Sequence, residues 1–162
     1  DWTSITNKPS GLVSSSTQIN TGSFSGSFSG TFSGAGAISN RNSVTVTTSN
    51  LADQANELGY AAFGKTWLLL KIEADRACRV RLYSTSGSRS SDLARAIGTD
   101  PSASAGVLAD FVFTAANTLI TSPVIIGANV EGSVSSSTSY TIQNRSGGAS
   151  TVTVTFTTIT ME

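Results

Sequence analysis

The chain lacks histidine altogether and has a single cysteine among its 162 residues. Without His there can be no Ser-His-Asp triad, Cys-His dyad or His-ligated metal site. One Cys cannot form an intrachain disulfide or a zinc cluster, and no spacing of acidic residues resembles an EF-hand loop. These absences remove the commonest routes to catalysis, and we predict no catalytic residue, no metal site and no cofactor.

Charge is also scarce, because ten Lys and Arg residues are balanced by ten Asp and Glu residues, for a formal net charge of zero. Such a balance lacks the basic surface with which proteins bind nucleic acid or anionic membranes. No apolar run approaches the roughly 20 residues that a membrane span requires. We therefore expect no nucleic-acid partner and no membrane insertion.

What the chain does have is hydroxyl groups: Ser and Thr together supply 50 residues. Chains of this composition can be disordered, but this one keeps runs of Val, Ile, Leu and Phe after residue 43. Thr and Val favour strands, whereas the good helix formers Glu and Lys are few. The composition predicts an all-β protein of the extracellular or viral kind.

Residues 22–34 form an internal repeat in which Phe and Gly alternate at even positions and Ser or Thr fills every odd one. In a strand this places Phe24, Phe28 and Phe32 on one face, with gaps at Gly between them. One strand cannot bury that face, so several copies around a shared axis are the natural arrangement. A flexible linker that happens to carry Phe is the alternative.

Ahead of the repeat, Trp2, Ile5 and Asn7-Lys8-Pro9 precede a Ser/Thr-rich stretch. This pattern resembles a motif that recurs in tail fibres and other fibrous proteins of tailed bacteriophages, often where a trimeric shaft begins. The resemblance implies a parallel homotrimer on a virion. We therefore expect residues 1–41 to form a fibrous shaft whose trimer interface includes Trp2, Ile5, Phe24, Phe28 and Phe32.

Residues 42–162 are predicted to be a separate head of short strands divided by turns. The strands are expected over 43–48, 66–74, 77–85, 106–114, 120–126, 138–144 and 151–160. Pro123 predicts that residues 120–126 form an edge strand or two separate pieces. Residues 50–58 are predicted to form a short helical turn capped by Asn50 and ended by Gly59. Seven or eight strands with two long connections predict an antiparallel β-sandwich of jelly-roll type.

The strand over 77–85 is expected to turn Cys78, Val80 and Leu82 inward, so that Cys78 is a buried structural thiol. In the strand over 66–74, alternation puts Leu68 and Ile72 on one face and Trp67 and Leu69 on the other. Much of the head, from Val80-Arg-Leu-Tyr-Ser onward, also resembles a β-sandwich module of phage structural proteins, which implies a structural role and carries no residue-level activity.

Eleven of the twenty charged residues lie between Lys71 and Asp110, and this cluster is the main candidate for a site. Arginine forks match the geometry of carboxylate and phosphate groups, so the cluster could bind an anionic sugar. In the alternative interpretation, Asp75, Asp92 and Asp100 neutralise the arginines and pin a crossover loop, or the charges lie at a subunit interface. The candidate ligand-binding residues are Arg79, Arg81, Tyr83, Arg89, Asp92 and Arg95.

Two carboxylate pairs could in principle serve a glycosidase: Glu73 with Asp75, about 7 Å apart along one strand, and Asp92 with Asp100. The spacing is unspecific, and we predict that the chain is not an enzyme. Tyr60 and Trp67 are expected either to stack on sugars or to close the junction between shaft and head.

The function expected from these features is that of the C-terminal part of a virion fibre, on tail or capsid, which attaches the particle to the bacterial surface, through polysaccharide. Its partners would be two further copies of itself, a host glycan or other receptor, and virion proteins attached upstream. A capsid-decoration or fibre-cap protein without its own receptor is the alternative, and a polysaccharide depolymerase is third.

Overall fold

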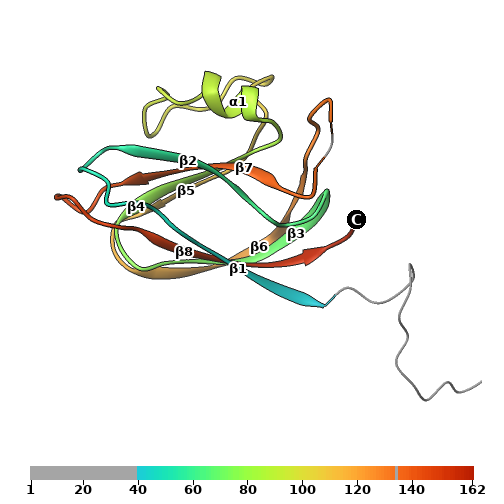
Figure 1. The fold of residues 1–162 in the computed structure, drawn as a ribbon, viewed down its shortest axis with the longest axis horizontal. Coiled ribbons are helices and arrows are strands. Elements are labelled where there is room, and N and C mark those ends of the chain that lie inside the picture. Colours follow the sequence, from blue (N-terminus) through green and yellow to red (C-terminus); the bar gives the residue numbers. More distant parts are fainter. Residues whose placement is uncertain (1–39, 134) are drawn as a thin grey trace, which may run out of the picture. The chain divides into compact units, whose positions relative to one another are not determined.

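The structure is a computed structural model that describes residues 40–133 and 135–162 (Figure 1). The predicted shaft, with Trp2, Ile5, Phe24, Phe28 and Phe32, lies outside the described residues, so its arrangement and the trimer stay predictions. The described part has eight strands and one short helix. These are β1 Arg41–Thr47, β2 Asn56–Ala61, β3 Thr66–Ala74, β4 Cys78–Tyr83, α1 Ser86–Ser91, β5 Val107–Phe113, β6 Asn117–Ala128, β7 Thr138–Asn144 and β8 Thr153–Thr160.

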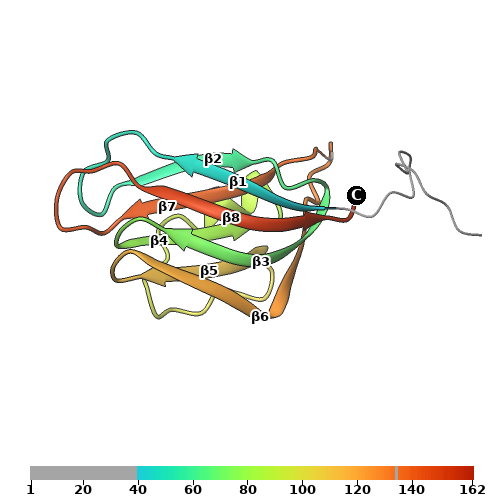
Figure 2. The same cartoon turned by 90° about the horizontal axis from the view of Figure 1, so that it is seen from below.

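The strands form two four-stranded sheets, one in the order β1-β8-β3-β6 and the other in the order β2-β7-β4-β5. Every pairing is antiparallel. Figures 1 and 2 show the sheets face to face, with α1 on the outer side of the β2-β7-β4-β5 sheet. The all-β, sandwich-like architecture predicted from the sequence is confirmed, and within the described residues no helix is long and apolar enough to cross a membrane.

A single core fills the space between the sheets, and aromatic rings lie at its centre. Phe63 contacts Trp67 edge to face at a centroid distance of 5.1 Å and Phe156 at 5.0 Å. Trp67 donates a 2.7 Å hydrogen bond from Nε1 to Oγ1 of Thr138, which belongs to the other sheet. The prediction that Trp67 stacks on sugars is therefore wrong, because its side chain is fully buried between the sheets; a role at the junction stays a prediction, since the shaft lies outside the described residues.

Cys78, Val80 and Leu82 of β4 lie in this core, as alternation predicts. Burial raises the pKa of the Cys78 thiol to about 12, because the charged thiolate would lose its hydration there. Cys78 is therefore a buried structural thiol, and it is protonated at neutral pH.

A β-bulge in β3 changes which residues face the core. The register with both neighbouring strands shifts between Leu69 and Lys71. Trp67 and Leu69 are buried before the bulge, and Ile72 and Ala74 after it. The extra residue reverses the alternation, so simple period-two counting places Ile72 on the wrong face.

The helical turn predicted over residues 50–58 is also wrong. Leu51 forms an isolated bridge with Ser150, and β2 begins at Asn56 with Glu57 and Leu58 opposite Ile142 and Thr141. Pairing with β7 supplies these backbone groups with partners, which outweighs the weak local helix signal. In contrast, the Pro123 strand β6 does lie at a sheet edge, as predicted.

Candidate functional site

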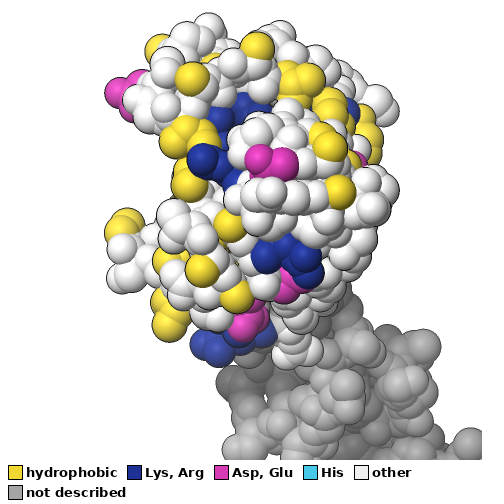
Figure 3. Space-filling view, turned by 90° about the vertical axis from the view of Figure 1, so that its left-hand side faces the viewer, with side chains coloured by type: hydrophobic (Ala, Val, Ile, Leu, Met, Phe, Trp, Pro, Cys, Tyr) yellow, Lys and Arg dark blue, Asp and Glu magenta, His cyan; other side chains and the backbone are white. Residues whose placement is uncertain are grey.

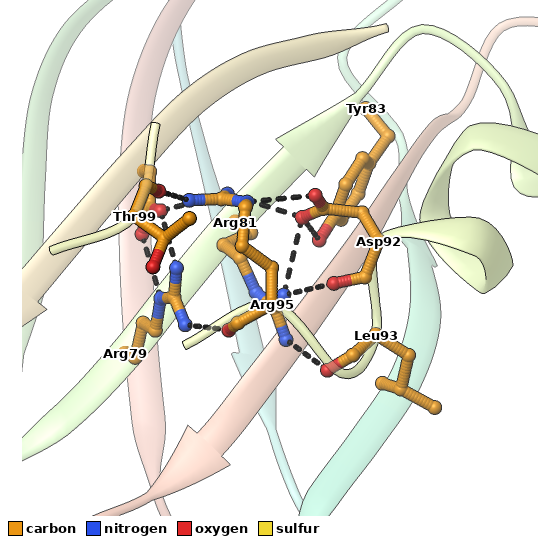
Figure 4. A network of polar contacts seen from close by, with 8 residues as sticks. Arg79, Arg81, Tyr83, Asp92, Leu93, Arg95 and Thr99 are labelled. Carbon is orange, nitrogen blue, oxygen red and sulfur yellow. Dashed lines mark hydrogen bonds and ion pairs between the residues drawn. The ribbon is translucent and has the colours of Figure 1, made fainter. Parts of the chain in front are cut away.

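The charged cluster is centred on β4, all six residues of which are buried. Cys78, Val80 and Leu82 face the core, so Arg79, Arg81 and Tyr83 face outward from the sheet. They are nevertheless covered, because the chain between β4 and β5, which includes α1, folds over this outer surface (Figures 1 and 4). The outward direction predicted for these side chains is confirmed, but it does not make them accessible.

Two carboxylates join three arginines into one network (Figure 4). The Asp92 carboxylate accepts from Arg81 Nη1 at 3.2 Å and from Arg95 Nε at 2.7 Å. The Asp110 carboxylate accepts from Arg79 Nε at 2.9 Å and Nη2 at 2.7 Å, and pairs with Arg95 Nη2 at 2.9 Å. Arg79 thus forms a bidentate pair with Asp110, and the two parallel N–H···O bonds make such a pair strong.

The same arginines also hold backbone carbonyls of the covering segment. Arg81 Nη1 donates to the Asp92 carbonyl at 2.7 Å and Arg79 Nη1 to the Arg95 carbonyl at 2.7 Å. Arg95 Nη1 donates to the carbonyl of Thr99 at 2.8 Å. The network therefore fastens a long connection to the sheet through both its side chains and its backbone.

Electrostatics keep both carboxylates of the network ionised. Burial by itself raises the pKa of Asp92, but hydrogen bonds from Arg95 and Tyr83 and the nearby arginine charges outweigh it, so the pKa lies below the ordinary value. The pKa of Asp110 is lowered in the same way, against burial, by Arg79 and Arg95. Burial and the bond to Asp92 raise the pKa of Tyr83, so its phenol stays a donor.

This geometry favours the loop-pinning interpretation of the cluster, in which Asp92 is an acidic partner of the arginines as predicted, whereas Asp75 and Asp100 are not. Asp75 pairs with its neighbour Arg76 at 3.0 Å, and Asp100 is exposed and forms no ion pair with a described residue; Asp110 takes their place. Arg81 Nε lacks a partner among the described residues, but it is shielded from solvent. Ligand binding by Arg79, Arg81, Tyr83, Asp92 and Arg95 stays a prediction.

The carboxylate pair Glu73 and Asp75 lines an open groove of about 580 Å³ at one end of β3, beside Asn117. Lys71 lies 2.7 Å from Glu73 and lowers its pKa through a hydrogen bond. The pKa of Asp75 is also lowered, by Arg76 and the Thr153 backbone against the effect of burial. A glycosidase acid needs a raised pKa, so neither group is tuned for that role. No cluster of three potential metal-binding side chains occurs in the described residues.

The sixth predicted ligand residue, Arg89, belongs to a different place on the surface. It lies on α1, its guanidinium carbon is 4.7 Å from the ring centroid of Tyr60, and its Nη1 donates to the carbonyl of Gly59 at 2.7 Å. The Arg89 side chain thus supports an exposed aromatic ring and takes no part in the network around Asp92.

Tyr60 borders a groove of about 380 Å³, which we call the Tyr60 groove. Its other walls come from the start of α1 and from the connection between β6 and β7. The groove is lined by Tyr60, Ser86, Asn129, Glu131, Ser133, Ser135 and Ser137. The sequence singled out Tyr60 but missed the groove, because Asn129 and Glu131 are about 70 residues away along the chain and only the fold brings them together.

The face of the described residues seen in Figure 3 carries no extended charged region. Figure 3 shows basic and acidic side chains in small groups, separated by uncharged atoms and single hydrophobic side chains. This distribution agrees with the zero net charge.

Comparison with known proteins adds no further assignment. No protein-family model matches the chain, and no curated protein matches it either. The two places on which a function can be argued are therefore the network around Asp92 and the Tyr60 groove.

Proposed function

We propose that this chain belongs to a virion fibre protein of a tailed bacteriophage, and that its sandwich is the head that attaches the particle to polysaccharide on the host surface. The observation that carries the proposal is the Tyr60 groove, where a ring that is 55% exposed lies beside serine hydroxyls and a carboxylate. Such a surface suits a polar, uncharged polymer better than a nucleic acid or a membrane.

The strand order supports a jelly-roll head. Eight antiparallel strands are divided into two sheets of four, and each successive strand passes to the other sheet except β5, which pairs with β4 in the same sheet. Double-sheet arrangements of this kind are common in capsid and lectin domains. The fold fits a virion or carbohydrate-binding role but does not select between them.

The proposed trimer explains how a shallow groove with weak affinity would attach the particle to a cell. The Phe/Gly face of residues 22–34 would be buried between three chains, and three heads would then engage one surface together. Linked weak sites gain apparent affinity through effective concentration, without any new contact.

The proposal is tested with the full chain. Sedimentation is expected to give a trimer, and the chain is expected to bind cells that the virion infects and to compete with its adsorption. Phe28→Ser should weaken both assembly and cell binding. A monomer that binds no cells would refute the proposal.

The alternative is a decoration or fibre-cap protein, and the use of Arg79, Arg81 and Arg95 as internal fasteners is the observation in its favour. Antibody labelling of virions decides between them: label over the capsid without inhibition of adsorption would support the decoration role. We propose no depolymerase activity, so incubation with host polysaccharide should release no new reducing ends.

A further inference from the structure

We infer that the Tyr60 groove binds a neutral saccharide. In this complex a sugar ring stacks on Tyr60, and sugar hydroxyls donate hydrogen bonds to the Glu131 carboxylate. The inference rests on the proposed attachment function and names the ligand class and the residues for it. It is carried by four properties of the groove: a supported aromatic ring, a preformed wall, an ionised carboxylate and a balance of charge.

The ring of Tyr60 is exposed and yet supported. The guanidinium of Arg89, 4.7 Å from the ring centroid, covers part of it, and Arg89 is itself only 8% exposed and tied to the Gly59 carbonyl. A ring that is supported on one side and 55% exposed loses little freedom when a ligand arrives. Its apolar surface suits the C–H face of a pyranose.

The opposite wall is built around Asn129, which is 7% exposed. Its Nδ2 donates to Ser135 Oγ at 3.2 Å and to the Ser137 carbonyl at 2.6 Å, and its Oδ1 accepts from the Glu131 backbone at 2.8 Å. The Asn129 side chain therefore holds Glu131, Ser135 and Ser137 in a defined arrangement before any ligand binds. The serine hydroxyls of this wall can both donate and accept, as sugar hydroxyls require.

Glu131 supplies the acceptor. Its Oε1 accepts from the backbone nitrogen of Ser86, which ties the wall to the start of α1, and that bond lowers the pKa of the carboxyl group. The carboxylate is therefore ionised at neutral pH. Glu131 lines the groove, and the lone pairs of its carboxylate that Ser86 does not use can accept from a ligand hydroxyl there. Hydrogen bonds to a carboxylate are stronger than those between neutral groups.

The charges of the Tyr60 groove disfavour acidic sugars, the ligand class that the arginine cluster would suit. The Tyr60 groove has one carboxylate, on Glu131, and the cation beside it, on Arg89, already supports the ring. A uronate or phosphate would meet Glu131, and a cationic ligand would meet Arg89. A neutral, polyhydroxylated ligand avoids both costs.

The test uses the full chain on an array of neutral hexose oligosaccharides and uronate-containing ones. The unchanged chain is expected to bind neutral glycans in preference. Tyr60→Ala and Glu131→Gln should each weaken that binding about tenfold, while Tyr60→Phe, which keeps the ring, should stay within about threefold. Ile126→Ala, at an exposed apolar residue on β6, and Asp100→Asn, at an exposed carboxylate, are the matched controls and should bind like the unchanged chain.

Three results would overturn the inference: no glycan binding, a preference for acidic glycans, or neutral-glycan binding that Tyr60→Ala leaves intact. Sedimentation of Tyr60→Ala tests whether the substitution disrupts the oligomer. Loss of the oligomer would also overturn the inference, because Tyr60 would then belong to a junction rather than to a ligand site. If the chain binds no glycan but still blocks virion adsorption, only the groove assignment fails. If it binds neutral glycans but does not compete with the virion, the attachment function fails and the groove assignment stands.

Discussion

Trp67 joins the two sheets through one buried hydrogen bond. The indole donates to Thr138 Oγ1, and both residues are fully buried. Opposite Trp67 in the register is Gly127, where a Cβ atom would come within 2.1 Å of the indole ring. The core therefore has room for the indole of Trp67 only because Gly127, its neighbour on β6, has no side chain.

Thr138→Val keeps the shape of the side chain but removes the acceptor, so the indole N–H is left buried without a partner. We expect a loss of about 1–3 kcal/mol in the free energy of unfolding, measured by urea denaturation. Thr155→Val is the matched control, because that hydroxyl contacts Thr45 Oγ1 on the exposed face of the sheet. Equal losses of unfolding free energy in the two variants would show that the buried indole hydrogen bond contributes no more to stability than the exposed Thr45–Thr155 contact.

At the scale of an element, ion pairs rather than an apolar face hold the chain between β4 and β5 against the sheet. Six of its residues form α1 and the rest has no regular structure, yet Asp92 is 7% exposed and Arg81 beneath it 1%. Asp92 accepts from Arg81, Arg95 and Tyr83. Loss of this one carboxylate would leave two arginines inadequately paired in a poorly hydrated place.

Asp92→Ala is expected to lower the free energy of unfolding by about 3–5 kcal/mol, as for a broken buried ion pair. Amide hydrogen exchange should rise first in residues 93–106, because those carbonyls lose the arginines that position them. Asp100→Ala should change stability by less than about 0.5 kcal/mol. If exchange rose evenly through both sheets, Asp92 would not be acting as a local fastener.

The strands show how far the sequence determines these elements. The bounds of β3 and β7 agree with the strands predicted over residues 66–74 and 138–144. The bulge after Leu69 has no local signal, since an extra residue is defined only against the partner strands. The helical turn expected over 50–58 depends on the Asn50 and Gly59 signals, which are local, whereas the pairing of β2 with β7 is not.

The candidate sites divide in the same way. The sequence identified the arginines of β4 and their outward direction, and the structure added the cover that buries them. It also identified Tyr60, but alternation and spacing could not place Glu131 and Asn129 beside it. What the sequence could not supply, in each case, is contact between segments joined only by long connections.

For the molecule as a whole, the ionised Asp92 and Asp110 make stability depend on pH at the acid end. Their pKa values are lower in the folded than in the unfolded chain, so the unfolded chain takes up protons first as the pH falls. Their contribution is complete above the ordinary carboxyl pKa of about 4 and is lost as the pH falls through the folded values.

We expect the free energy of unfolding to be level near neutral pH and to fall steadily below about pH 5. Urea denaturation at a series of pH values measures this. Asp110→Asn should be less stable at pH 7 and should show a shallower loss on acidification. An unchanged slope in that variant would mean that other carboxylates carry the acid sensitivity.

The pairing of β1 has a mechanical consequence. β1 lies at a sheet edge and pairs with β8 alone, from Arg41 opposite Ile159 to Thr47 opposite Thr153. A pull on residue 40 along the strand, while the rest of the sandwich is held, acts across all of these antiparallel hydrogen bonds. They share the tension in shear instead of opening one after another, so the first strand of the sandwich is suited to transmit force from the chain that precedes it.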